Sequence, residues 1–481
     1  MNLRPALLAM SALLLQACAG MGGIAPQSRQ LDPRGLDPGA ALSAPQADAG
    51  WPQPGWWKAY GDPQLDALVD TALAGNPDLR IAQARVRQAA GQSAAAGAAT
   101  LPEVDGSAGF IRTLQTREEF SPSLIGAYAY WDNSALLKAS FDLDLWGKNR
   151  ATAEGALDAQ QAAEVNVRAA GLTLAAAAVQ GYVQLDAQYA LRDVAQANLE
   201  RQQQVLDIAR RRYAAGLGTE LEVTEAATVL PETQAQLEQI DEAIALQRHQ
   251  LAALAGEGPG DGDRLARPAL HDGAAVDLPA AIPAGLVGRR PDIVAQRWAV
   301  EAAGKDIAVA RARFYPDVNL VAFAGLEGLS FDRFFQNSAT TYGAGPALTL
   351  PVFEGGRLRG NLQAQTAAYD IAVETYNRTV IAALQQVSDQ IASLRSLQTQ
   401  LQRTDEALAL AQQAYHQAEL GFRAGLSDYL SVLNTQGELL AQQRSRAQIE
   451  ARRLAAHTAL MQALGGGFDD TAADATAGGQ P

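Results

Sequence analysis

Cys18 is the residue whose setting implies chemistry most directly, and it is the only cysteine in the chain. It follows Leu15-Gln16-Ala17, which in turn follows Arg4 and an apolar run, the order of a secretory signal. The stretch resembles a bacterial lipobox, in which the cysteine is acylated after cleavage. We therefore expect residues 1–17 to be a signal peptide and Cys18 to carry an N-palmitoyl, S-diacylglycerol anchor. The alternative is an ordinary cleavage site beside a chance cysteine, because Gln16 is unusual at its place.

No catalytic arrangement is recognisable among the other reactive residue types. The sequence contains no HExxH, GxSxG or P-loop pattern, and its glycine-rich stretch 256–262 lacks the Lys-Ser/Thr pair of a phosphate loop. We therefore expect no enzyme activity, no catalytic residue, no metal site and no cofactor beyond the lipid anchor. The four histidines are scattered along the chain: His249, His271, His416 and His457.

The charge and hydropathy of the chain limit which partners and which membrane-spanning structures it can have. Its formal net charge is −14, which disfavours a nucleic-acid partner. Ala19, rather than Asp, follows Cys18, which in lipoproteins implies sorting to the outer membrane. After residue 18 no stretch approaches the ~20 consecutive apolar residues of a spanning helix. Any membrane-spanning part of the mature chain must therefore be β-structure.

The chain contains two weak copies of one unit. Asn76-Pro77-Asp78-Leu79 matches Arg290-Pro291-Asp292-Ile293, 214 positions later, and residues 101–104 match 315–318 at the same offset. A second pair, 213–217 and 422–426, lies 209 positions apart. The sequence is therefore a tandem duplication of a unit of about two hundred residues.

Long helical patterns fill most of each copy, at 148–255 and 356–463. A strict seven-residue apolar repeat predicts helices packed side by side as in a coiled coil. At ~1.5 Å per residue the longest helices are about 100 Å long, too long for a compact domain. The repeat is clearest in Val373, Val380, Val387, Leu394, Leu401, Leu408, Tyr415 and Phe422, and partly kept in Leu185, Leu199, Leu206 and Tyr213.

Each copy also contains a predicted β-hairpin, at about 103–146 and about 317–352. In 137–145 apolar and polar residues alternate without a break, and in the second copy apolar residues recur at every second position, at Val318, Leu320, Ala322, Ala324 and Leu326. Strands of about thirteen residues, or ~40 Å, are long enough to cross a ~25 Å apolar band at a tilt. A small soluble sheet is the alternative.

Four strands per chain imply self-association if they lie in a membrane. The smallest outer-membrane barrels have eight strands, and an open sheet edge in lipid leaves backbone groups unpaired. Two copies would give eight strands with a filled interior, whereas three would give twelve strands and a lumen. The strand count favours an oligomer, and a homotrimer in particular.

The order of several short motifs resembles the TolC-like outer-membrane factors of tripartite efflux systems, in their lipoprotein (NodT/OprM) branch. No single motif is decisive, but together they cover almost the whole mature chain in the family's order. The motifs are Trp56-Trp57, Asp62-Pro63-Gln64-Leu65, Asn76-Pro77-Asp78-Leu79, Phe141-Asp-Leu-Asp-Leu-Trp-Gly147, Arg289-Arg-Pro-Asp-Ile293, Phe314-Tyr-Pro-Asp317 and Gly345-Pro-Ala-Leu-Thr-Leu-Pro-Val-Phe-Glu-Gly-Gly356.

The resemblance implies an α+β, mostly α fold. Three chains would share a twelve-stranded outer-membrane β-barrel, continued by a periplasmic α-barrel with an equatorial domain. The implied function is passive conduction of drugs or other small molecules out of the cell in an efflux or type I-like secretion system. The implied partners are a periplasmic adaptor (membrane fusion protein) and an inner-membrane pump. The adaptor would dock at two helix reversals, Gly216-Leu217-Gly218-Thr219 and Gly425-Leu426-Ser427-Asp428. Alternatively, Gly216 and Gly425 merely end helices.

The resemblance also places a pore gate one turn into the last long helix. The family's ring of leucines corresponds to Leu430, and its ring of aspartates corresponds to Asn434, so this sequence departs from the pattern. Asparagine cannot ionise, and Asp428 is then the nearest carboxylate. We expect a gate that depends on leucine packing and responds weakly to pH and divalent cations.

The expected organisation follows from these assignments. It is a signal peptide at 1–17, a lipidated tether at 18–50, a first repeat at 51–255, an equatorial linker at 256–290, a second repeat at 291–464 and a flexible tail at 465–481. Two rival classes remain. A trimeric coiled-coil adhesin or autotransporter-like surface lipoprotein would place four consecutive strands at the C-terminus, whereas here the hairpins lie about two hundred residues apart. A soluble helical scaffold would need no lipid.

Overall fold

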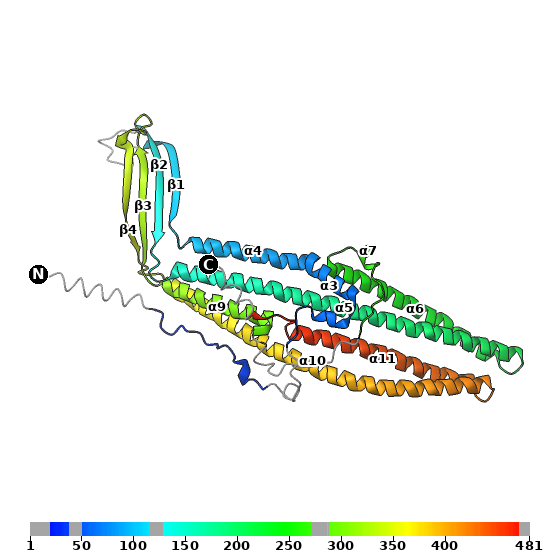
Figure 1. Cartoon of the computed structure of the whole chain (residues 1–481). Helices are drawn as coiled ribbons and strands as arrows, with labels where there is room; N and C mark the ends of the chain where they lie inside the picture. Colours follow the sequence, from blue (N-terminus) through cyan, green and yellow to red (C-terminus); the bar gives the residue numbers. More distant parts are fainter. Residues whose placement is uncertain (1–19, 38–50, 116–127, 272–285, 287, 471–481) are drawn as a thin grey trace. The chain divides into compact units, whose positions relative to one another are not determined.

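The computed structural model describes residues 20–37, 51–115, 128–271, 286 and 288–470 (Figure 1). The lipidation site predicted at Cys18 and the end of the predicted tail, 471–481, lie outside the described residues. The elements are, in order, η1 (Pro33–Gly35), η2 (Trp56–Tyr60), α3 (Pro63–Gly75), α4 (Pro77–Ala98), β1 (Glu103–Gln115), β2 (Tyr128–Asp142), α5 (Lys148–Ala214), α6 (Glu220–Ala255), α7 (Pro259–Gly262), α9 (Pro291–Ala312), β3 (Asp317–Gly328), η3 (Asn337–Ala339), β4 (Thr340–Thr349), α10 (Arg357–Arg423) and α11 (Tyr429–Ala463).

The duplication predicted from the sequence is confirmed element by element. Helices α4 and α9 each have 22 residues and begin at Pro77 and Pro291. Helices α5 and α10 each have 67 residues and begin at Lys148 and Arg357. The two copies nevertheless do not fold separately. Contacts within the chain divide it into two compact units, and each unit contains residues of both copies. The first unit comprises 1–30, 85–164 and 295–377, and the second comprises 31–84, 165–294 and 378–481.

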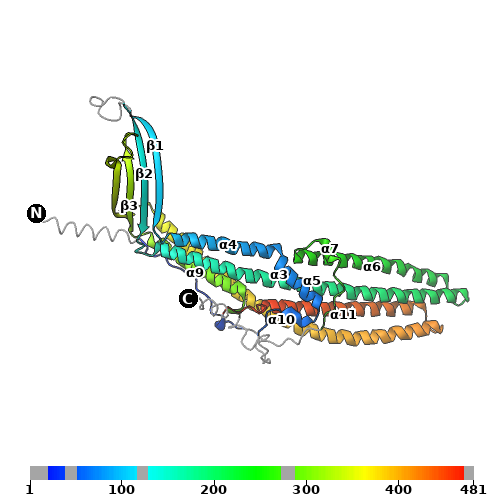
Figure 2. The same ribbon diagram turned by 45° about the horizontal axis from the view of Figure 1, so that its top comes forward.

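The first unit contains a four-stranded antiparallel sheet in the order β1-β2-β3-β4 (Figures 1 and 2). Within the described residues β1 pairs only with β2 and β4 only with β3, so both edge strands have an unpaired side. The register places most of the apolar residues of the four strands on one face, as the alternation predicts, while Ile111, Leu136, Val321 and Phe323 lie on the other. That face carries Val104, Ala108, Phe110, Trp131, Ala135, Leu137, Ala139, Val318, Leu320, Ala322, Ala324, Leu326, Ala344 and Leu348.

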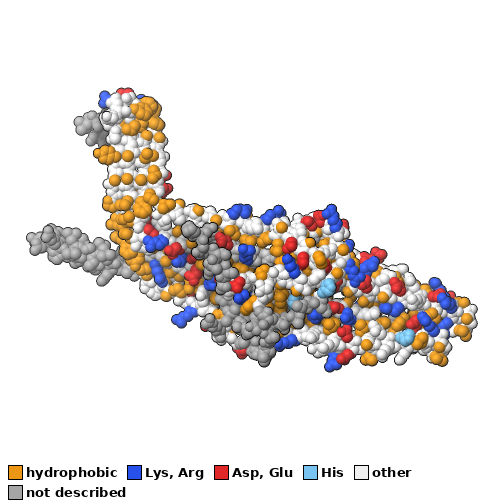
Figure 3. All heavy atoms as spheres, in the orientation of Figure 1, with side chains coloured by type: hydrophobic (Ala, Val, Ile, Leu, Met, Phe, Trp, Pro, Cys, Tyr) orange, Lys and Arg blue, Asp and Glu red, His pale blue; other side chains and the backbone are white. Residues whose placement is uncertain are grey.

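The opposite face of the sheet is largely polar. It carries most of the charged and hydroxyl side chains of the strands, although Val321 and Phe323 interrupt it. Hydrophobic side chains are visible along the sheet and at its base in Figure 3. The polar residues are Glu103, Asp105, Ser107, Asp132, Ser134, Lys138, Ser140, Asn319 and Glu327.

Two strand ends differ from the sequence prediction. Strand β2 ends at Asp142, so Leu143 and Leu145 lie beyond it, because the carboxylates that follow the strand bond to the start of α5. Strand β4 spans 10 residues, Thr340–Thr349, instead of reaching Val352. Its last residue, Thr349, pairs with Asp317, the first residue of β3, so the partner strand extends no further.

The seven-residue repeat of α10 lies in the interior of the helical packing. Val373, Val380, Val387, Tyr415 and Phe422 are buried, and Leu394, Leu401 and Leu408 are partly buried against neighbouring clusters. In the weaker repeat of the first copy, Leu185, Leu199 and Leu206 are buried as predicted. Tyr213, which is 49% exposed, is not. Tyr213 is the last but one residue of α5, where the helix is about to reverse.

One described helix, α5, is long and apolar enough to cross a membrane by length and composition, with a window of mean hydropathy 1.2. The same helix supplies Ala175, Val179 and Tyr182 to the largest apolar cluster of the second unit. These residues of α5 therefore pack against protein, although only 28% of the apolar window is buried.

The segments next to both chain ends are packed, which the sequence did not predict. Met21 and Ile24 lie against the cluster formed by Phe314, Leu358 and Leu362, in what was expected to be a tether. Residues 465–470 were expected to begin a flexible tail, but Asp469 pairs with Arg289 at 3.1 Å. Three successive glycines with positive φ permit that path, at Gly465, Gly466 and Gly467.

Tyr60, fully buried, joins η2 to the end of α11. Its hydroxyl lies 2.8 Å from His457 Nδ1 and 2.8 Å from Thr458 Oγ1. Burial, reinforced by the positive charge of Arg453, lowers the pKa of His457 to about 4. The neutral imidazole is therefore the form that the folded state stabilises.

We predict that the contribution of His457 to the free energy of unfolding falls as the pH drops from 8 to 5. An unfolded histidine takes up its proton near pH 6.5. Because the unfolded state binds more protons between that value and about pH 4, acid favours unfolding, by about 2 kcal/mol at pH 5. Chemical denaturation at both pH values should show this loss in the wild type and in H416Q, which changes an exposed histidine. The loss should shrink in H457Q, and an equal loss in H457Q would contradict the assignment.

Candidate functional site

Two helix reversals lie where the sequence predicted them, and they share one hydrogen-bond pattern. Gly216 has φ 72°, and the Leu217 N–H donates to the Arg212 carbonyl at 2.9 Å. Gly425 has φ 74°, and the Leu426 N–H donates to the Gly421 carbonyl at 2.8 Å. Both are glycine-terminated helix ends of the Schellman type.

Each reversal then opens the next helix with a side-chain cap. Thr219 Oγ1 accepts from the Glu222 N–H, and Glu222 accepts from the Thr219 N–H, which forms a capping box. Asp428 Oδ1 accepts from both the N–H and the hydroxyl of Ser431. These bonds hold the pKa of Asp428 below its usual value. Asp428 is therefore engaged as a helix cap.

The reversals present apolar side chains to solvent. Leu217 is 71% exposed and Leu426, its equivalent in the second copy, is 85% exposed. Gly218 lies in the first turn, and Ser427 in the second turn donates a long hydrogen bond to the Ala418 carbonyl. The structure thus brings the predicted docking residues together in two exposed turns of similar construction.

Arg212 links the two turns, and this link was not predicted from the sequence. Its Nη1 donates to the Phe422 carbonyl at 2.7 Å and its Nη2 to the Leu217 carbonyl at 3.1 Å. Its guanidinium carbon also lies 4.7 Å from the centre of the Phe422 ring. The neighbouring Arg211 pairs instead with Asp207 on its own helix. One arginine therefore ties the end of α5, the first turn and the end of α10 together.

The predicted gate residues share one exposed face of α11. Leu430 is 58% exposed and Asn434, one turn further along, is also exposed. Tyr429 and Val432, on the other side of the helix, are buried in the cluster that joins α5, α6, α10 and α11. In one chain, Leu430 and Asn434 thus point away from the packed helices.

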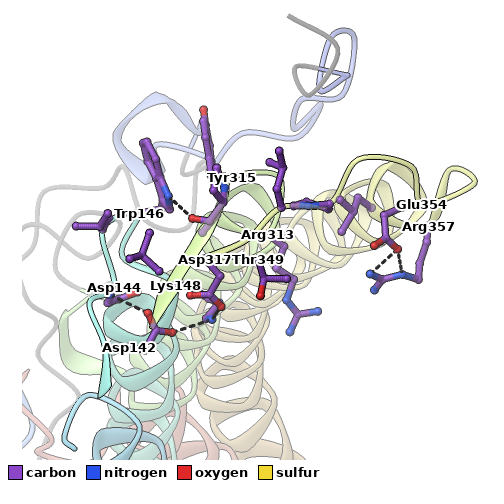
Figure 4. Close-up of a pocket in the computed structure, with 17 residues that line it drawn as sticks. Asp142, Asp144, Trp146, Lys148, Arg313, Tyr315, Asp317, Thr349, Glu354 and Arg357 are labelled. Carbon is purple, nitrogen blue, oxygen red and sulfur yellow. Dashed lines mark hydrogen bonds and ion pairs between the residues drawn. The ribbon is translucent and has the colours of Figure 1, made fainter. Parts of the chain in front are cut away.

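The base of the sheet contains a cavity of about 470 Å³, where the Phe141–Gly147 motif meets residues 312–318 (Figure 4). Lys148 Nζ lies 3.0 Å from Asp142 and 2.7 Å from Asp317, so it joins the ends of β2 and β3 to the start of α5. These bonds raise the pKa of Lys148 against the opposing effect of burial.

Two aromatic rings stack beside the same junction. Trp146 and Tyr315 have ring centres 4.4 Å apart and an interplanar angle of 18°, and the indole N–H donates to the Pro316 carbonyl at 2.8 Å. Asp144, at φ 46°, accepts from the N–H groups of Asn149 and Arg150 and so caps α5. The residues of the Phe141–Gly147 and Phe314–Asp317 motifs therefore connect strands to helices.

Among the described residues, no group of three or more His, Cys, Asp or Glu side chains is placed to hold a metal ion.

Known proteins similar to this chain have been identified by sequence and by structure. A family model described as outer membrane efflux protein matches residues 68–257 and 284–466. The fusaric acid resistance protein FusA of Burkholderia cepacia is 45% identical over 365 residues, 75% of this chain and 69% of FusA. The multidrug resistance outer membrane protein MdtP of Shigella flexneri is 30% identical over 470 residues, 95% of each chain. The solved outer membrane protein VceC of Vibrio cholerae is 35% identical, with a TM-score of 0.82 over 87% of this chain and 100% of VceC.

We predict that R212Q loosens both turns. Removing a charge-assisted hydrogen bond costs about 1.5–3 kcal/mol, which corresponds to at least about tenfold faster local opening. Hydrogen–deuterium exchange at the amides of 214–218 and 424–427 measures this. The matched control is R211Q, because the side chain of Arg211 is 78% exposed and its ion pair contributes little. Equal exchange in the two variants would remove Arg212 from this role.

Proposed function

Because this chain belongs to the outer membrane efflux protein family, we propose that three copies form one passive tunnel that conducts small molecules across the outer membrane. The chain is an outer-membrane component of an efflux system, and its relatives are transport proteins. The proposal adds the trimer, the gate, the docking turns and the lipid anchor. The alternative function, a trimeric adhesin, has no support, because the relatives are efflux and resistance proteins.

The unpaired edges of the sheet carry this proposal. Strands β1 and β4 each expose one row of backbone donors and acceptors. In lipid each unpaired group costs several kcal/mol, so β4 of one copy must pair with β1 of the next. Three copies give twelve strands, enough to enclose a lumen, whereas eight strands are filled by their own side chains.

The faces of the sheet suit a barrel of that kind. The apolar face meets lipid and the polar face lines the lumen. The 12 residues of β3 span about 40 Å, or roughly 30 Å along the membrane normal at a tilt near 40°. That length exceeds the ~25 Å apolar band of an outer-membrane barrel. The exposed pair Trp146 and Tyr315 then lies at the periplasmic interface, where aromatic residues are favoured.

The two exposed turns are the docking site for a periplasmic adaptor that connects the tunnel to an inner-membrane pump. Leu217 and Leu426 offer apolar contacts at equivalent positions. Leu430 and Asn434 form the gate, since both project from α11 away from the packing of their own chain. Opening is a shift of these helices that adaptor contacts stabilise, because a bound partner favours the state it binds better.

The N-terminal segment supports a lipid anchor at Cys18. Gly20 accepts a hydrogen bond from Arg359, and Gln27 and Ser28 donate to Asp370 at 2.9 and 3.0 Å. The segment therefore follows the first turns of α10, and its beginning lies near the start of that helix.

The cargo is a class of small organic compounds. FusA is named for fusaric acid resistance and MdtP for multidrug resistance, and this chain shares the architecture that serves both. A passive tunnel performs no reaction on what passes through it, and the pump selects the compound.

The channel is tested with purified protein in planar bilayers and by native mass spectrometry. We expect a mass of three chains and low resting conductance. L430A should raise the resting conductance several-fold because it removes apolar packing at the constriction. The matched control, L410A, changes an exposed leucine of α10 and should leave conductance unchanged. A monomer that ignores lipid would disprove the channel, and unchanged conductance in L430A would remove Leu430 from the gate.

A second prediction concerns ions at the gate. Three asparagines carry no charge, so the wild-type current should respond weakly to divalent cations. N434D should introduce block by divalent cations, which deepens as pH rises through the titration of the carboxylate. Strong block in the wild type that N434A abolishes would contradict the neutral gate.

The anchor makes a third prediction. C18S should abolish incorporation of labelled palmitate yet leave trimers in the outer membrane, because the strands also hold the protein there. Palmitate labelling and membrane fractionation measure the two effects. Labelling that survives in C18S would show that the lipid is attached elsewhere.

A further inference from the structure

A cluster of five aromatic rings lies at the end of the sheet away from the helices. Phe110 is 5.9 Å from Phe331 and 5.4 Å from Phe334 between ring centres, and Trp131 is 6.2 Å from Phe331. Phe335 completes the cluster at 5.1 Å from Phe334. Phe110 and Trp131 belong to the apolar face, and the other three rings come from the turn between β3 and η3.

This turn anchors itself with one ring and exposes the other two. Phe334 is 1% exposed, whereas Phe331 is 52% and Phe335 74% exposed. Asn133, which pairs with Phe110 in the register, is completely buried. The turn thus adds an exposed aromatic surface to the apolar face at this one level.

Two arginines accompany the rings. Arg112 lies two residues beyond Phe110 on the same face, with its guanidinium carbon 5.5 Å from the centre of the Trp131 ring. Arg333 is exposed in the turn between Phe331 and Phe334. Within the described residues neither arginine forms an ion pair, and the neighbouring Asp332 is hydrogen-bonded to Ser330. We call Arg112, Arg333, Trp131, Phe331 and Phe335 the aromatic–arginine surface.

The position of this surface defines its partner. A lipid-facing arginine costs about 2–4 kcal/mol at the bilayer midplane and close to nothing at the interface, so Arg112 marks the headgroup level. If the helices lie in the periplasm, as the proposed function requires, this level is in the outer leaflet. That leaflet contains a phosphorylated glycolipid, and guanidinium groups bind phosphate through paired hydrogen bonds.

We propose that the aromatic–arginine surface binds the phosphate groups of lipid A in the outer leaflet. Arg112 and Arg333 pair with the phosphates, and Phe331 and Phe335 pack against the adjoining acyl chains. The charge of the unpaired arginines complements the ligand, and the apolar face continues directly into the surface. The site rests on the proposed membrane orientation but is separate from the gate and the docking turns.

The test is a lipid titration of delipidated full-length mature protein, read by native mass spectrometry. The probes are bis-phosphorylated lipid A, the same lipid without phosphates, and phosphatidylglycerol. Wild type should bind bis-phosphorylated lipid A at least about tenfold more tightly than either other lipid, since each phosphate contact is charge-assisted. The R112Q/R333Q variant should lose that preference. The matched control, R80Q, changes an exposed arginine of α4 and should keep it.

Three outcomes overturn the proposal. They are equal binding of lipid A with and without phosphates, equal binding of phosphatidylglycerol, and a preference that survives in R112Q/R333Q. Trimer mass and bilayer conductance are measured on the same samples. Conducting trimers without the lipid preference refute this site alone, whereas a protein that neither assembles nor conducts refutes both this site and the channel.

Discussion

The unpaired backbone groups along β1 and β4 are the constraint on which the rest of the molecule depends. A sheet of four strands has two such edges, and a membrane offers no water to satisfy them. In the proposed tunnel, copies of the same chain pair with both edges, because the contact between β1 of one copy and β4 of the next repeats around a ring. The long helices continue from the strands. In the proposed trimer, the number of chains that closes the barrel therefore also sets the number of helices around the tunnel.

The junction between strands and helices explains the densest motif of the sequence. Asp142, Lys148 and Asp317 form one ion-pair group, and Asp144 caps α5. A strand pair and a helix pair have different spacing and twist, so a chain that passes from one to the other needs strong directional bonds at the point of change. Charged residues at this position therefore serve architecture, which is consistent with relatives that carry molecules without transforming them.

Sequence periodicity predicted most of the fold because burial repeats along regular elements. The heptads of α10, the alternation of β3 and the paired helix lengths all follow from one face of each element being apolar. The boundaries of β2 and β4 were less accurate, because side-chain bonds at the start of α5 and the first residue of β3 limit ladders that hydropathy alone would continue. Arg212 was missed because its partners are backbone carbonyls more than two hundred residues apart or within a turn. Adjacent arginines look alike in a sequence, and only the fold separates Arg212 from Arg211.

The two turns, alike in backbone yet different in side chains, have a consequence for stoichiometry. The position equivalent to Arg212 in the second copy is Gly421. Arg212 bonds to the Leu217 carbonyl of the first turn, whereas Arg423, next to the second turn, pairs with Glu419 on its own helix. A ring of three chains would thus display six near-identical loops of two alternating kinds. A ligand that contacts only the shared backbone and leucines can bind every loop, whereas one that contacts Arg212 can bind only half of them. Gene duplication followed by divergence of the turn side chains, Arg212 against Gly421 among them, is enough to convert pseudo-sixfold symmetry into a choice between six sites and three.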